Sequence, residues 1–115
     1  MLVQEYDDFN PKLFECIDKA LISILGGAST STFYYAISER FDLARGDFER
    51  KPLEVLDHLR TIVGEGGFSI LELAIVSQII ETFKIANEDH KKIGISNALE
   101  QAEKNHLRSN FIHRS

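Results

Sequence analysis

The residues of this 115-residue chain with the clearest capacity for chemistry are four histidines and one cysteine. His106 and His113 are seven positions apart, which on one helix gives them a common face but separates them by about two turns. They are therefore too far apart to bind one metal ion alone. His58 and His90 lie on other segments, and the ligand spacings of zinc motifs are missing. We expect no metal site.

The cysteine and the hydroxyl side chains do not indicate a nucleophile. Cys16 lies beside an apolar stripe and lacks the neighbours that activate a thiol, so we expect a small buried hydrophobic residue. The serines and threonines at 29–32 are best explained as helix caps. A single cysteine forms no internal disulfide and suits a reducing compartment. The acidic start, MLVQEYDDFN, does not resemble a signal peptide, and we expect a cytoplasmic protein.

The segment Gly64-Glu65-Gly66-Gly67 is the one candidate for an anion site, because it precedes a predicted helix. However, no strand precedes it, no Lys-Ser/Thr pair follows it, and Glu65 would repel a phosphate. We expect a tight connection between two helices, with at least one glycine at positive φ. Acidic and basic residues between 42 and 57 mix as on an ordinary solvated surface. We therefore predict no enzyme and no cofactor.

The elements that would position these residues are all helical. Apolar content of 43%, charged content of 27% and a net charge of −5 are typical of one soluble domain, and the charge disfavours duplex nucleic acid as a partner. We predict an all-α, compact helical bundle of about five helices around a central helix at 68–84. The domain comprises a core at 10–85, a linker at 86–92 and a C-terminal helix at 93–112.

Proline, glycine and capping residues mark the expected ends of the helices. After a loose acidic lead-in at 1–9, Asn10 and Pro11 should start the first helix, and Gly26-Gly27 should end it. A hydroxyl among residues 28–32 should cap the second helix, and Pro52 should start the third. Ser96 is the expected cap of the last. We find no strand-like alternation.

The apolar residues predict which helix faces are buried. The central helix, FSILELAIVSQIIETF, is apolar around most of its circumference, so neighbours should cover it on several sides. It is too short to predict a membrane span, and Glu72 interrupts it close to its start. The second helix should bury Phe33, Ile37 and Phe41, with Tyr34 close to that face and Tyr35 at its edge. The third should bury Leu53, Leu56, Leu59 and either Ile62 or Val63, and Phe48 should plug the connector.

Four segments carry a resemblance to a known family: IDKALISILGG, FYYAISERFDL, GDFERKPLEVLDHL and IVGEGGFSILELAI. Together they make residues 17–85 similar to the fifth of the Nitrosopumilus output domains, a small archaeal family. Val63 and Gly67 replace an aromatic residue and an alanine of the family's turn, and Gly27 is one glycine more than its pattern has. The resemblance implies a helical module that occurs alone or attached to signalling proteins, with no catalytic residues to carry over.

Two functions remain in view. The first is a non-enzymatic archaeal regulatory or adaptor module acting through protein–protein interaction. The alternative is a DNA-associated transcriptional regulator using the C-terminal helix, whose polar residues suit a DNA-reading face better than those of the second helix do. Those polar residues are Gln101, Lys104, Asn105, Arg108, Asn110 and Arg114. Overall acidity favours a protein partner or a homodimer over nucleic acid. We also predict no contact with a membrane.

The C-terminal helix is the expected partner surface, because the family-like core ends near residue 85 and should already cover its own central helix. Its thin apolar stripe would then be left for a partner. The partner-binding candidates are Ile95, Leu99, Ala102, Leu107 and Phe111, with Tyr34 and Tyr35 as a second location. An equally open alternative is that this helix folds back onto its own bundle as a fifth member.

Overall fold

The computed structural model describes the backbone of residues 2–85 and 93–114, and the side chains of residues 8–85 and 93–108. Within this part the chain is helical and contains no strand, which confirms the predicted all-α bundle. The elements are α1 (Leu2–Leu25), α2 (Gly27–Phe41), the short 3₁₀ helix η1 (Arg45–Asp47), α3 (Pro52–Thr82) and α4 (Ile95–Arg114). Four α-helices replace the expected five, because α3 unites the predicted third and central helices. The predicted linker at 86–92 lies outside the described residues.

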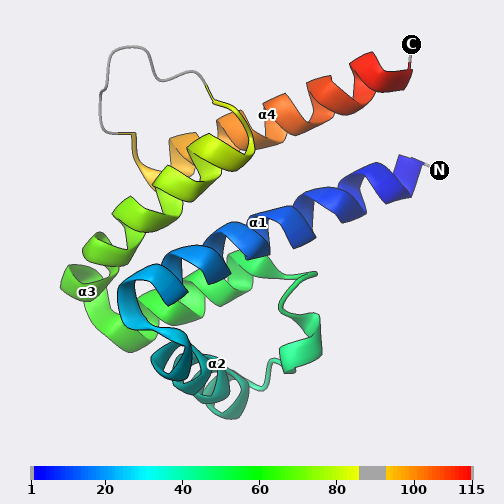
Figure 1. Ribbon diagram of the computed structural model, residues 1–115. Coiled ribbons are helices and arrows are strands. Elements are labelled where there is room, and N and C mark those ends of the chain that lie inside the picture. The colour runs from blue at the N-terminus through cyan, green and yellow to red at the C-terminus, as the bar shows by residue number, and fades with distance from the viewer. Residues whose placement is uncertain (1, 86–92, 115) are drawn as a thin grey trace.

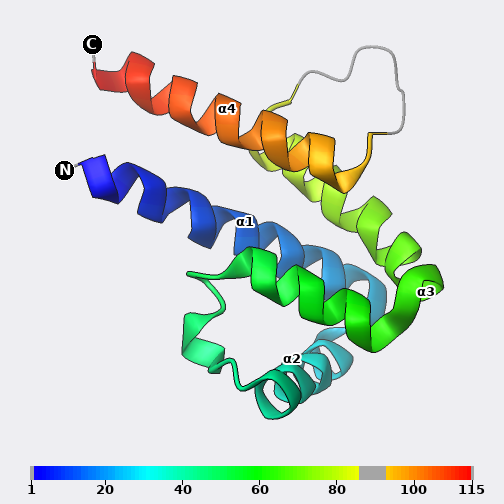
Figure 2. The same ribbon diagram turned by 180° about the vertical axis from the view of Figure 1, so that it is seen from behind.

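Helix α1 runs through the middle of the molecule, and both halves of α3 pack against it (Figure 1). Seen from behind, α2 and η1 lie on one side of α1 and α4 lies on the other (Figure 2). The principal dimensions are 44 × 36 × 20 Å. The shortest is only about two helix diameters, so outer helix faces remain in contact with solvent.

The start of α1 differs from the prediction. A helix starting at Pro11 after a loose lead-in is wrong, because α1 begins at Leu2 and Pro11 lies inside it. Phe9 in the turn before the proline packs on Phe83 at 5.3 Å and on His106 at 5.4 Å between ring centroids. These contacts stabilise helical structure that the local sequence does not indicate. Asn10 does not cap the helix; its side chain donates to the carbonyl of Arg50.

The turn from α1 to α2 depends on Gly26, as predicted. Its φ of +86° belongs to the backbone region that favours glycine, and α2 starts at the next residue. The predicted hydroxyl cap is wrong, because no side chain caps α2. Thr30 and Thr32 instead donate from inside the helix to the carbonyls of Gly26 and Ala28, which lie four residues earlier.

The core between α1, α2 and the connector is built on three aromatic rings. Phe14, Tyr34 and Phe48 are buried, and their centroids lie 5.3–6.0 Å apart. The plug role of Phe48 is thereby confirmed. On α2 the buried residues are Thr30, Tyr34 and Ile37, while Phe33 and Phe41 are only half-buried. The buried face is therefore turned toward Tyr34 relative to the prediction.

Gly64 divides α3 into two helical halves, 52–63 and 65–82. Its φ of +79° and ψ of 171° are non-helical, whereas the residues on both sides continue the helix. The predicted break and the predicted glycine at positive φ are both confirmed here. The first half runs parallel to α1, and the second returns along it and leads toward α4 (Figure 1). One glycine thus places α1 between two segments of α3.

The second half of α3 is buried on one face only. Phe68, Leu71, Ile75, Val76 and Ile79 are buried, as is Phe83 just after the helix, but Ile70 is 61% exposed and Leu73 is 58% exposed. The prediction that neighbours cover this helix on several sides is therefore wrong. In the first half, Leu56 and Leu59 are buried as predicted, Ile62 and Val63 are half-buried, and Leu53 is exposed. A bundle about two helices thick has no element to cover these outer faces.

The backbone at Gly64 supports a test by substitution. Gly64→Ala should cost about 1–3 kcal/mol of unfolding free energy, because its backbone region is almost exclusive to glycine. Gly66→Ala is the matched control: Gly66 is exposed and helical, so alanine there should add about 0.5–1 kcal/mol. A Cβ at either position meets open space, so the conformation alone separates the two variants. Chemical denaturation measures both, and equal effects would contradict the break at Gly64.

Candidate functional site

The described side chains assemble no metal site. No group of three or more His, Cys, Asp or Glu among them is arranged to hold an ion. His58 stacks on Phe41 with a centroid distance of 4.0 Å, and His106 is buried beside Phe9 and Phe83. The side chains of His90 and His113 lie outside the described residues.

Cys16 is built into the core. It is buried, and its thiol lies 3.7 Å from the carbonyl oxygen of Gln78, to which it donates. Burial raises the pKa of the Cys16 thiol, so the thiolate that nucleophilic chemistry requires is disfavoured.

Helix α4 buries most of the stripe that we assigned to a partner. Ile95, Ala98, Ala102 and His106 are buried against the bundle. The prediction that Ile95 and Ala102 form a free partner surface is therefore wrong, and the alternative of a helix folded back onto its own bundle describes the structure. Leu99 and Leu107 are half-buried, and the side chain of Phe111 lies outside the described residues.

Two side chains tie α4 to the second half of α3 and to the residues that directly follow it. The Glu72 carboxylate accepts a hydrogen bond of 3.0 Å from the backbone N–H of Ile95, the first residue of α4. Ten residues further along α4, the Asn105 amide donates to the carbonyls of Phe83 and Lys84 at 3.1 and 3.3 Å. Residue 72 is hydrogen-bonded to residue 95, and residue 83 to residue 105. The second half of α3 and α4 therefore run parallel. Glu72 therefore takes the capping role expected of Ser96, which lies within α4.

The same contacts weaken the DNA-reading alternative. A DNA-reading face needs free amide and basic side chains. The Asn105 amide already donates to the carbonyls of Phe83 and Lys84, and Gln101 is half-buried. Lys104 and Arg108 remain exposed, and the side chains of Asn110 and Arg114 lie outside the described residues.

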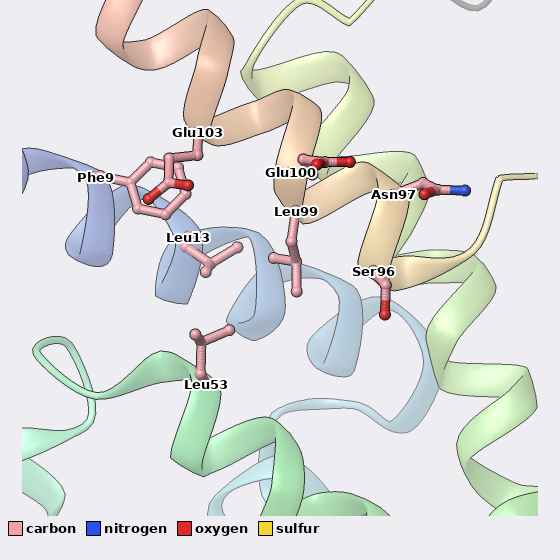
Figure 3. A pocket seen from close by; sticks show the side chains of 8 residues that line it. All are labelled: Phe9, Leu13, Leu53, Ser96, Asn97, Leu99, Glu100 and Glu103. Carbon is pink, nitrogen blue, oxygen red and sulfur yellow. The ribbon is translucent and has the colours of Figure 1, made fainter.

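A groove lies between α4 and the start of α3, with α1 as its floor (Figure 3). We call it the α3–α4 groove, and its volume is about 410 Å³. Leu13, Leu53 and Leu99 come from three different helices and point into the same space (Figure 3). The remaining lining residues are Phe9, Ser96, Asn97, Glu100 and Glu103. The two charged residues of this lining are both acids, and both are exposed.

A second groove lies between α1 and α2, and we call it the α1–α2 groove. Its volume is about 420 Å³, and it includes both tyrosines of the sequence-based prediction. Tyr35 is 68% exposed at its edge. Tyr34 is buried, and its hydroxyl donates to the Asp18 carboxylate at 2.8 Å. Of the predicted partner residues, Tyr35 therefore presents the largest exposed fraction among those whose side chains are described.

One described helix, α3, is a candidate to cross a membrane. Within the described residues, α3 is long and apolar enough by length and composition to cross a bilayer, and 28% of its most apolar stretch is buried. This is weak support for a membrane span, since core helices of soluble proteins also pass such a test. The absence of membrane contact stays a prediction.

Comparison with known proteins identifies no relative: no protein-family model, curated protein or solved structure matches this chain. The resemblance to the output-domain family stays a prediction.

The tie at Glu72 generates a test of how α4 is held. Glu72→Ala should lower the unfolding free energy by about 1 kcal/mol, because it removes the acceptor for a helix N-terminal N–H. Glu81→Ala is the matched control: the same substitution, in the same helix, at an exposed glutamate. Thermal and denaturant unfolding measure the difference, and two equally stable variants would show that the Glu72–Ile95 bond does not hold α4.

Proposed function

We propose that this protein is a non-enzymatic regulatory or adaptor module of the archaeal cytoplasm that works by binding another protein. We further propose that the α3–α4 groove receives the partner. The observation that carries the proposal is Leu53, which is 54% exposed at the mouth of an apolar groove whose charged residues are both acids.

The groove suits a helix better than a small substrate. It is open and bounded by two helices; its apolar side chains come from three helices, whereas its polar side chains all lie along α4. A partner helix could place apolar side chains, spaced three or four residues apart, between Leu13, Leu53 and Leu99. Burying such contacts stabilises a complex chiefly through the few side chains that fill the centre.

The charge of the groove determines the expected partner. Glu100 and Glu103 lie on the α4 side, and the whole chain carries a net charge of −5. A helix with lysines or arginines beside its apolar face would be attracted and oriented by this field. The partner we propose is accordingly a basic amphipathic helix of another protein.

Three considerations rank this proposal above the alternatives. The resemblance of residues 17–85 to the output-domain family favours a regulatory role, with no catalytic residues implied. A homodimer would need a basic apolar face on the second copy, whereas the overall charge is acidic. DNA reading by α4 is disfavoured because Asn105 is engaged with α3.

The proposal is tested by Leu53→Arg. Replacing an exposed leucine should leave the fold intact, remove an apolar anchor and place a positive charge where a basic helix docks. Affinity capture from the native host with wild-type protein identifies the partner. Calorimetry with the purified partner should then show binding at least about tenfold weaker for Leu53→Arg, a loss of about 1.4 kcal/mol.

The matched control is Ile24→Arg, the same type of change at an exposed apolar residue of α1 outside the groove. It should bind the partner like the wild type. Light scattering over a range of protein concentrations gives the molecular mass and so distinguishes a homodimer from a monomer. If Leu53→Arg and Ile24→Arg bind the partner equally well, the α3–α4 groove is not the docking surface.

A further inference from the structure

The α1–α2 groove contains two opposite charges that do not neutralise each other. Asp18 lies on α1, and Arg45 of η1 lines the same groove. No ion pair joins them, and neither forms an ion pair with any other described residue. Oppositely charged side chains that share a groove without touching leave hydrogen-bonding positions for a third group.

Arg45 is held in place by aromatic rings. Its guanidinium carbon lies 5.2 Å from the ring centroid of Phe14, 4.9 Å from that of Tyr34 and 5.1 Å from that of Phe48. Such contacts are favourable for a cation, and the N–H groups of Arg45 form no hydrogen bond with a described residue. Arg45 is therefore positioned and charged, with donors available for a carboxylate.

Asp18 is held from the other side. One of its carboxylate oxygens accepts the Tyr34 hydroxyl at 2.8 Å, which fixes the orientation of the carboxylate. Burial and the neighbouring Asp18 raise the pKa of Tyr34, so its hydroxyl remains a donor. The second carboxylate oxygen has no hydrogen bond to any described residue and is available to a cation.

The separation of the two charges suits a small molecule. Both charges lie next to the same side chain: the Arg45 guanidinium carbon is 4.9 Å from the Tyr34 ring centroid, and the Asp18 carboxylate accepts the Tyr34 hydroxyl at 2.8 Å. A ligand with a single negative charge would also meet Asp18, and one with a single positive charge would also meet Arg45. Only a ligand that carries both charges matches both residues.

The remaining lining provides room for an apolar group. Beyond Asp18, Ile22 and Tyr35 are exposed apolar side chains on opposite helices of the groove. The hydroxyls of Ser31 and Ser38 also line it. We propose that the α1–α2 groove binds a free amino acid with a medium-sized apolar side chain, its ammonium group on Asp18 and its carboxylate on Arg45. This site is separate from the α3–α4 groove and does not depend on the proposed protein partner.

The test is a titration of the full chain, labelled with ¹⁵N, with L-leucine at millimolar concentration. Amide shifts should appear at residues 18–22 and 30–38 and saturate. Isoamylamine lacks the carboxylate of leucine and isocaproate lacks its ammonium group, so each should bind at least about tenfold more weakly. Inorganic phosphate, a probe for a simple anion site, should bind still more weakly.

Two variants locate the binding. Arg45→Gln and Asp18→Asn should each weaken L-leucine binding at least about tenfold, and asparagine retains an acceptor for the Tyr34 hydroxyl. Arg60→Gln is the control, because Arg60 lies 4.5 Å over the Phe68 ring but outside the groove. Should Arg45→Gln fail to fold, Asp18→Asn and the leucine analogues still decide. The proposal is overturned if L-leucine causes no saturable shifts, if a singly charged analogue or phosphate binds as well, or if Asp18→Asn binds like the wild type.

Discussion

The pair of side-chain ties between α3 and α4 determines what the rest of this structure can present to a partner. Glu72 satisfies the N–H at the start of α4, and Asn105 satisfies carbonyls at the end of α3. Each group would otherwise be left unpaired at a helix terminus, where backbone hydrogen bonds are incomplete. Between these two points Ala98 and Ala102 are fully buried, and their small side chains let the helices approach closely. Helix α4 is thus part of the core.

This placement converts an expected free helix into one wall of a groove. With the inner face of α4 buried, Leu99 on its flank faces Leu53 across the floor formed by α1, and Glu100 and Glu103 line the same groove (Figure 3). The α3–α4 groove therefore exists only because α4 is docked. The α1–α2 groove depends instead on the aromatic cluster around Phe48, which places Arg45. The two candidate sites are built on different supports and can be tested separately.

Local signals in the sequence predict the helices well, and long-range contacts explain where the predictions fail. Gly26, Pro52 and Gly64 mark turns or helix starts through their own backbone preferences. The helix before Pro11 depends on Phe9 packing against residues more than seventy positions away, which local propensity does not report. Leu53 fits a helical apolar stripe, but in a bundle this thin that stripe is wider than the covered face.

The candidate sites also depend on contacts between residues far apart in the sequence. A stripe of small apolar residues on α4 fits a partner or the chain's own core equally well, so sequence alone left both open. Glu72, an acid within a long apolar stretch, was a usable signal, but its partner Ile95 is 23 positions further along the chain. Both grooves draw residues from three elements, and no spacing in the sequence brings these together.

Native-state hydrogen exchange tests the docking of α4 most directly, because it reports the free energy of opening for each amide. The amides of residues 98–106 should open with free energies within about 1 kcal/mol of those at Val76 and Ile79, since the ties and the buried alanines make α4 part of one cooperative unit. Near-zero protection throughout residues 98–106, alongside strong protection in α1 and α3, would contradict the account and return α4 to the role of a free surface.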